Sequence, residues 1–224
     1  MPRPDQRRSE LPKMNKHLSI ITVFLFVSLA GTAHAQYFLS TILEVNGTPG
    51  SGMLLGTGII GLGDINNDGK PDFAVSTHGI GKTFIYFGGQ GVLDGVPDIT
   101  LRGGDNMVMG DLNGDGLKEL IIHQGYYTNT PGGLDTILVY FGKPLSPLSI
   151  DTVAGLIITS ENAADGFGYA MDIGDLNNDG FDDLVIGASY YSGEKGKVYV
   201  YLGKSQLTNI PDFVIVGEYH NTWF

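Results

Sequence analysis

Short apolar runs separated by polar turns make up most of residues 36–224, and no stretch among them has the periodicity of a helix. Short runs rich in Val, Ile, Tyr and Phe, bounded by Gly, Asn and Pro, are typical of β-strands. The pattern is clearest late in the chain, where it predicts four strands at 167–173, 183–188, 197–202 and 213–216. Runs at 99–101 and 156–158 are expected to be the fourth strands of two earlier groups. We therefore expect an all-β fold.

The apolar runs do not alternate with polar residues. Leu184, Val185 and Ile186, for example, follow one another directly. A strand with one solvated face would alternate, so an unbroken apolar run predicts a strand buried on both faces, between packed sheets.

One acidic turn occurs three times, each time between the first and second predicted strands of a group. It begins at Gly63, Gly110 and Gly174 and reads Gly-Asp-x-Asn-x-Asp-Gly-x-x-Asp/Glu. Each copy is followed by a second shared run that ends in Gly, at 83–88, 137–142 and 198–203. Repeats built from several short strands predict the four-stranded blades of a β-propeller, or a related β array. The units span about 47–101, 106–158 and 167–216.

The spacing of two Glu–Phe pairs predicts the start of a fourth unit at 217–224. Phe167 follows Glu161 at the same distance as Phe224 follows Glu218. Three blades do not close a ring and would leave apolar faces open. We therefore expect a partial propeller of about three blades, truncated from a larger ring.

The acidic turns offer oxygen ligands at regular positions. Counted from the first Asp, side-chain oxygens stand at positions one, three, five and nine, and position seven offers a backbone carbonyl. Glycine at position six permits the positive φ that turns the chain around an ion. Five or more oxygens suit Ca²⁺ better than Mg²⁺, so we predict about three Ca²⁺ ions, one per loop. The predicted ligands are Asp64, Asn66, Asp68, Lys70, Asp72, Asp111, Asn113, Asp115, Leu117, Glu119, Asp175, Asn177, Asp179, Phe181 and Asp183.

Other interpretations of the loop are weaker. An EF-hand needs a Glu at position twelve, where this chain has Val75, Ile122 and Ile186, and a dockerin-like module also needs helices. An acidic Asx turn without a metal remains the alternative. Three copies in register favour calcium.

The amino-acid composition and the net charge exclude some kinds of binding site and partner. The chain has 34 glycines and no cysteine, and its net charge is −11. The absence of cysteine excludes disulfides, iron–sulfur clusters and zinc thiolates, and the negative charge disfavours nucleic-acid binding.

Residues 1–35 differ from the rest. Basic residues precede an apolar run at 18–30, and the small-x-small site Ala33-His34-Ala35 follows it. This arrangement predicts a secretory signal peptide cleaved after Ala35, with residues 36–224 as the propeller region outside the cell or at its surface. The alternative is an uncleaved N-terminal anchor. We expect no transmembrane span in the mature chain.

The third unit begins Phe167-Gly168 and continues after its acidic turn with Gly187-Ala188-Ser189. It resembles the FG-GAP repeat of integrin α-subunit β-propellers and of related bacterial secreted proteins. The first two units diverge: Leu55-Gly56 replaces Phe-Gly, and residues 76–78 and 123–125 replace the Gly-Ala-Pro tripeptide. The resemblance covers about residues 37–224.

The resemblance implies a propeller, commonly of seven blades, with calcium loops on one face and ligand surfaces on the opposite face or the rim. It implies a structural role for the acidic side chains and transfers no ligand site. Recognition is expected in the loops that vary most, 125–134, 143–155 and 190–196, because loops on a rigid scaffold usually hold function.

A search for catalytic groups finds no HExxH, GxSxG or P-loop motif. We interpret His78 and His123 as turn or surface residues, and Asp172 and Asp182 as solvated or as outer neighbours of the ion. The pairs Tyr126-Tyr127 and Tyr190-Tyr191 either pack between blades or form a stacking surface for a sugar or protein.

The sequence thus favours a secreted calcium-binding propeller that binds an unknown extracellular protein or glycan, and not an enzyme. Two alternatives stay open. The chain is the N-terminal part of a larger extracellular hydrolase with its catalytic residues beyond 224, or it is a purely structural spacer.

Overall fold

The computed structural model describes residues 54–89, 95–125, 133–144 and 149–218. The predicted signal peptide, residues 219–224 of the fourth unit predicted to start at 217, and the pair Tyr126-Tyr127 lie outside these ranges. Within them, no helix has the length and apolar character needed to cross a bilayer.

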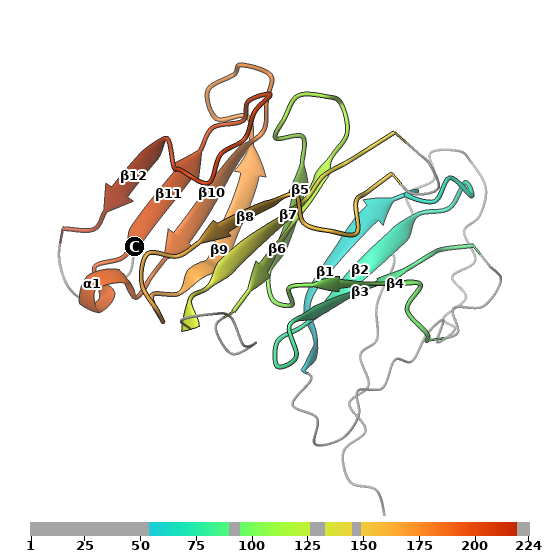
Figure 1. Cartoon of the computed structure of the whole chain (residues 1–224), viewed down its shortest axis with the longest axis horizontal. Coiled ribbons are helices and arrows are strands. Elements are labelled where there is room, and N and C mark those ends of the chain that lie inside the picture. The colour runs from blue at the N-terminus through green and yellow to red at the C-terminus, as the bar shows by residue number, and fades with distance from the viewer. Residues whose placement is uncertain (1–53, 90–94, 126–132, 145–148, 219–224) are drawn as a thin grey trace, which may run out of the picture.

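Among the residues that the structure describes, twelve strands form three four-stranded antiparallel sheets, and the strands of each sheet pair in chain order. We call these sheets blades 1, 2 and 3 (Figure 1). Blade 1 holds β1 (Leu55–Gly63), β2 (Asp72–Thr77), β3 (Lys82–Tyr86) and β4 (Ile99–Arg102). Blade 2 holds β5 (Met107–Gly110), β6 (Glu119–Gln124), β7 (Thr136–Tyr140) and β8 (Leu156–Thr159). Blade 3 holds β9 (Phe167–Gly174), β10 (Asp183–Ala188), β11 (Lys197–Tyr201) and β12 (Phe213–Val216).

The prediction of an all-β fold is confirmed, and so are the four strands of blade 3 and the fourth strands of blades 1 and 2. One helical turn, α1 (Tyr191–Glu194), was not predicted. Ser192 and Gly193 within it have positive φ, so it is a tight connection between β10 and β11 with no amphipathic pattern to detect.

The blades follow one another across the molecule and touch through their first strands. β5 contacts β1 on one side and β9 on the other (Figure 1). Blade 2 therefore lies between the other two, and its central strands are buried on both faces, as the unbroken apolar runs predict. This is the arrangement of adjacent propeller blades.

Two apolar cores fill the spaces between blades. Side chains alternate along a strand, so neighbours on β6 enter different cores. Leu120 and Ile122 join the core between blades 1 and 2, and Ile121 joins the core between blades 2 and 3. All three are fully buried. At about 25 cal/mol per Å² of apolar surface, such burial is the main force that holds neighbouring blades together.

Candidate functional site

The three acidic loops lie at one end of the blades, between β1 and β2, β5 and β6, and β9 and β10. In the first loop, the Asp64 carboxylate accepts backbone N–H bonds from Asp68 at 3.1 Å and Gly69 at 2.8 Å. Asp68 in turn accepts the N–H of Lys70 at 2.9 Å. Asp175 and Asp179 make the matching bonds in the third loop. The side chains at positions one and five thus shape each loop from within.

Backbone conformation repeats as well. Position six has positive φ in every loop, 83° at Gly69, 84° at Gly116 and 91° at Gly180. Position four is also left-handed, with φ of 60° at Asn67 and 61° at Asn178. Only glycine and, less often, asparagine adopt this region readily. The predicted role of the position-six glycine in turning the chain therefore agrees with the geometry.

The carboxylate at position nine behaves differently from the others. Asp183 is fully buried, and its two oxygens accept the N–H of Leu176 at 3.0 Å and of Gly203 at 2.8 Å. Asp72 makes the same pair of bonds, to Ile65 at 2.9 Å and Gly88 at 2.8 Å. The residue therefore clamps the start of its loop to the segment that follows the third strand of its blade. Sequence reasoning predicted only a ligand at this position.

Glu119 is the longer equivalent in blade 2. It accepts the N–H of Leu112 at 2.7 Å and of Gly142 at 3.4 Å. Burial raises its pKa to about 7, with the charges of Asp115 and Asp111 adding to the effect and the two N–H bonds opposing it. Burial likewise raises the pKa of Asp72.

Neighbouring loops are joined to one another. The carboxylate of Asp182 accepts the N–H of Asp111 at 2.8 Å, and the Asp182 N–H is donated to the Asp111 carbonyl at 2.9 Å. The ring of Phe181 lies over Gly114, where a Cβ would collide with it. Asp182, which we interpreted as solvated or as an outer neighbour of an ion, is therefore a link between blades 2 and 3. Asp172 accepts the N–H of the adjacent Ile173 at 2.9 Å.

The donor set of each loop consists of oxygens, which suits Ca²⁺. In the part of the chain that the structure describes, no three His, Asp or Glu side chains gather closely enough to hold a metal ion. The loop carboxylates instead face N–H groups of their own loops. A carboxylate oxygen that accepts one N–H keeps a second lone pair, so these bonds do not exclude a cation. Calcium binding stays a prediction.

A second polar cluster lies at the opposite end of the blades. The Nδ1 atoms of His78, beyond β2, and His123, on β6, face the two oxygens of Asp105. The Nε2 atom of His123 lies 3.6 Å from Asp135. Because His123 is fully buried between blades 2 and 3, its interpretation as a turn or surface residue is wrong. The residue lies within β6, whereas the pattern of apolar residues in the sequence predicted that the strand would end before it and that His123 would lie in a turn.

Two of the three variable loops, 125–134 and 190–196, come between the second and third strands of their blades, which meet them at this same end; residues 126–132 of the first lie outside the described residues. The described part of the third, 143–144 and 149–155, reaches the acidic loops, where the Ser149 N–H is donated to the Ile65 carbonyl at 2.9 Å. Tyr190 is exposed and lies edge-to-face with exposed Tyr169, at 6.5 Å between ring centroids. Its neighbour Tyr191 packs against the core between blades 2 and 3.

Comparison with known proteins agrees with this architecture. The family model for the FG-GAP repeat matches residues 167–201, and that for an FG-GAP-like repeat matches residues 64–122. Phosphatidylinositol-glycan-specific phospholipase D of Bos taurus is 34% identical over 121 residues, which cover 49% of this chain and 14% of that protein. Integrin alpha-3 of Mus musculus is 31% identical over 116 residues, covering 51% of this chain and 11% of that protein.

Integrin alpha-7 of Rattus norvegicus is 31% identical over 137 residues, covering 55% of this chain and 11% of that protein. The chain thus matches a small part of each relative, at most 14% of its length. Both family matches include an acidic loop and the strands around it. The chain carries FG-GAP repeats at residues 64–122 and 167–201 and is similar to integrin α-subunits over about half its length, and its three sheets are blades of a partial β-propeller.

Proposed function

We propose that the chain is a secreted propeller module that binds calcium through its acidic loops and an extracellular protein or glycan through the opposite end of its blades. The observation that carries the proposal is the same loop, with the same hydrogen bonds and backbone turns, in all three FG-GAP blades. Its relatives are extracellular or surface proteins, and the predicted signal peptide agrees with secretion.

Electrostatics support the calcium component. Each loop carries three carboxylates along one short stretch of the chain, and drawing them together around one point would be unfavourable unless a cation offsets their charges. Side-chain oxygens at positions one, three, five and nine, with the carbonyl at position seven, would hold the ion. A bound cation would fix the loop, and through the position-nine clamp it would also fix the third strand of the same blade.

Thermal unfolding tests this component. Ca²⁺ added to EDTA-treated protein should raise the melting temperature, and Mg²⁺ should raise it less, because Mg²⁺ requires stricter octahedral geometry. A melting temperature indifferent to Ca²⁺ would reject the calcium component and leave the ligand component standing.

Loop position supports the ligand component. The loops 125–134 and 190–196 share the end that carries the exposed pair Tyr169 and Tyr190. Aromatic rings with one apolar face and one polar end are common in sugar- and protein-binding surfaces. Glycan and cell-surface protein arrays should give a signal that Tyr190→Ala weakens, while Ile210→Ala, at an exposed site beyond β11, leaves it unchanged. Arrays without any signal would favour a structural spacer.

A second candidate rests on the relatives. Several are named phosphatidylinositol-glycan-specific phospholipase D, which places repeats of this kind in an enzyme. We propose a repeat segment of a larger extracellular hydrolase as the alternative function. A longer reading frame that carries a hydrolase motif beside these repeats would support it.

A further inference from the structure

The second acidic loop is held by blade 3 as well as by its own blade. Asp182, at position eight of the third loop, accepts the N–H of Asp111 at 2.8 Å through its carboxylate. The Asp182 N–H is donated in return to the Asp111 carbonyl at 2.9 Å. Asp111 holds position one of the second loop and is the first of its predicted calcium ligands. Both backbone groups of this ligand are therefore bonded to one residue of the neighbouring blade.

Two further contacts hold the same loop from blade 3. The Lys204 N–H, beyond β11, is donated to the carbonyl of Leu112, at position two, at 2.9 Å. The ring of Phe181 lies over Gly114, at position four, where φ is 72° and a Cβ would strike the ring. Only a residue without a Cβ allows so close an approach. Positions one, two and four of the second loop thus all contact blade 3.

The side chain of Asp111 depends on where its backbone is held. Its carboxylate accepts the N–H of Gly114 at 2.8 Å and of Gly116 at 2.8 Å, so it lies at the centre of the loop. Bonds that orient a ligand from outside commonly change metal affinity by about 10–100-fold when they are removed. The bond from Asp182 is of this kind, although it comes from another blade.

The junction between blades 1 and 2 has no carboxylate at the equivalent place. Position eight of the second loop is Lys118, whose ammonium group donates hydrogen bonds and accepts none. The bond at position two is present there, because the Ser149 N–H is donated to the Ile65 carbonyl at 2.9 Å. The Asp182 carboxylate therefore distinguishes the second loop from the first.

We propose that Asp182 is a positioning residue for the second loop, because its carboxylate holds Asp111 where it binds the ion. The inference rests on the proposed calcium function, and it assigns Asp182 to the neighbouring loop and not to its own. The second site is then complete only when blade 3 packs against blade 2. Because Asp182 lies between two predicted ligand positions of the third loop, Ca²⁺ in either loop should favour Ca²⁺ in the other.

Calcium titration of the isotope-labelled chain, followed by NMR, tests the proposal loop by loop. Gly69, Gly116 and Gly180 hold position six, and the amide of each is bonded to the position-one carboxylate of its loop at 2.8–2.9 Å. Each of these amides therefore reports on one loop of the intact protein.

Asp182→Ala should raise the Ca²⁺ concentration that half-saturates the Gly116 amide by about tenfold or more. The Gly69 amide should titrate as in the wild type, because its loop has no such bond. The variant is expected to fold, because the backbone bonds from Asp182 and Lys204 to the second loop remain. In EDTA, amide exchange at Asp111 should become faster in this variant.

Asp182→Asn separates positioning from charge. The amide oxygen of asparagine still accepts the Asp111 N–H, whereas the negative charge is lost. This variant should therefore restore most of the wild-type affinity at Gly116 and the slow amide exchange at Asp111.

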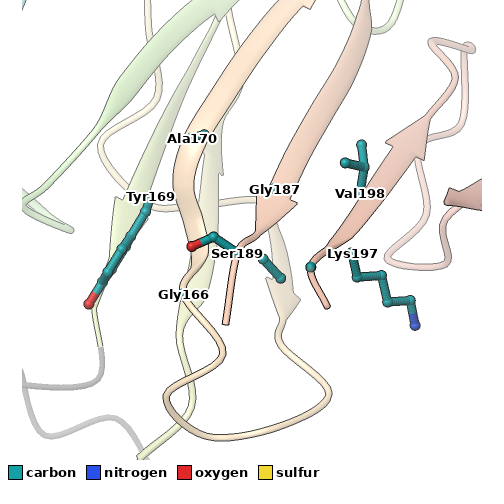
Figure 2. Close-up of a pocket in the computed structure, with 9 residues that line it drawn as sticks. Gly166, Tyr169, Ala170, Gly187, Ser189, Lys197 and Val198 are labelled. Carbon is teal, nitrogen blue, oxygen red and sulfur yellow. The ribbon is translucent and has the colours of Figure 1, made fainter. Parts of the chain in front are cut away.

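Two variants of blade 3 serve as controls. Asp172→Ala removes an equal charge from an exposed residue of β9, whose carboxylate accepts the N–H of the adjacent Ile173 at 2.9 Å. Ser189→Ala changes an exposed side chain at the opposite end of the blade, where Ser189 lines a hollow together with Tyr169 and Val198 (Figure 2). Neither should alter the titration of the second loop.

A loss of affinity at Gly116 in Asp182→Ala that Asp182→Asn reverses would establish the positioning role. An unchanged Gly116 titration in Asp182→Ala, with all three amides still responding to Ca²⁺, would overturn it and leave the proposed function standing. Equal losses in the two variants would also overturn it, since charge alone would then act. If none of the three amides responded to Ca²⁺, the calcium component would be rejected and the positioning role with it.

Discussion

Asp183 has two proposed roles: its buried carboxylate clamps the backbone of the loop, and it is a predicted calcium ligand. Removing this carboxylate in the absence and in the presence of calcium separates the two roles. Asp183→Ala leaves the N–H groups of Leu176 and Gly203 without their acceptor. A buried donor left unpaired costs about 1–3 kcal/mol, and only the N–H beside exposed Leu176 has ready access to water. We therefore expect a loss of about 2–4 kcal/mol in the free energy of unfolding, even without calcium.

Asp179→Ala is the matched variant in the same loop. Asp179 accepts the N–H of Phe181 at 3.0 Å in an exposed setting, where water can replace it. Without calcium its loss should cost at most about 1 kcal/mol, because the removal of one carboxylate also relieves repulsion in the loop. With calcium, both variants should lose most of the added stability, because each lacks a charged ligand.

Urea unfolding in EDTA and in Ca²⁺, followed by circular dichroism, measures all four differences. Equal losses for the two variants in EDTA would refute the clamp, since position nine would then act only as a ligand. A stable Asp183→Ala variant in EDTA would refute it as well.

Three further predictions concern the junctions between blades. Ile121→Ala should lower the free energy of unfolding by about 2–4 kcal/mol in urea titrations, because Ile121 is fully buried between blades 2 and 3, whereas exposed Val214→Ala should change it by at most about 0.5 kcal/mol. Gly114→Ala should destabilise the second loop, seen as faster amide exchange there, because φ is 72° and a Cβ would strike the Phe181 ring; unchanged exchange would contradict the contact. Burial, with a smaller effect from the charge of Asp135, raises the pKa of Asp165, so its contribution to stability is present below about pH 4 and is lost as pH rises through the folded-state pKa. Asp165→Asn keeps the acceptor for the Phe167 N–H and should flatten this decline, and an unaltered pH profile would refute the assignment.

Local patterns were sufficient to predict the strands. The run at 183–188 and the Val- and Tyr-rich run at 197–202 became adjacent strands of one blade, β10 and β11, because turn residues bound each of them. The turn at Gly180 was also predictable, since glycine at a positive φ follows from the loop's spacing.

Contacts between distant segments were not predictable from these patterns. The bond from Gly203 to Asp183 depends on where the third strand ends, and the bond from Asp111 to Asp182 depends on how blade 3 stands against blade 2. The burial of His123 likewise follows from Gly168, whose missing Cβ would lie 2.6 Å from the His123 ring. Such relations arise only when the blades are assembled.

The proposed function depends on calcium binding by the three acidic loops, which titration calorimetry of EDTA-treated, dialysed protein measures without any change of fold. We expect saturable Ca²⁺ uptake by the wild type, and reduced uptake when Asp64, Asp111 or Asp175 is replaced by Ala, because each holds position one of a different loop. Absence of any Ca²⁺ uptake at millimolar concentration would contradict it.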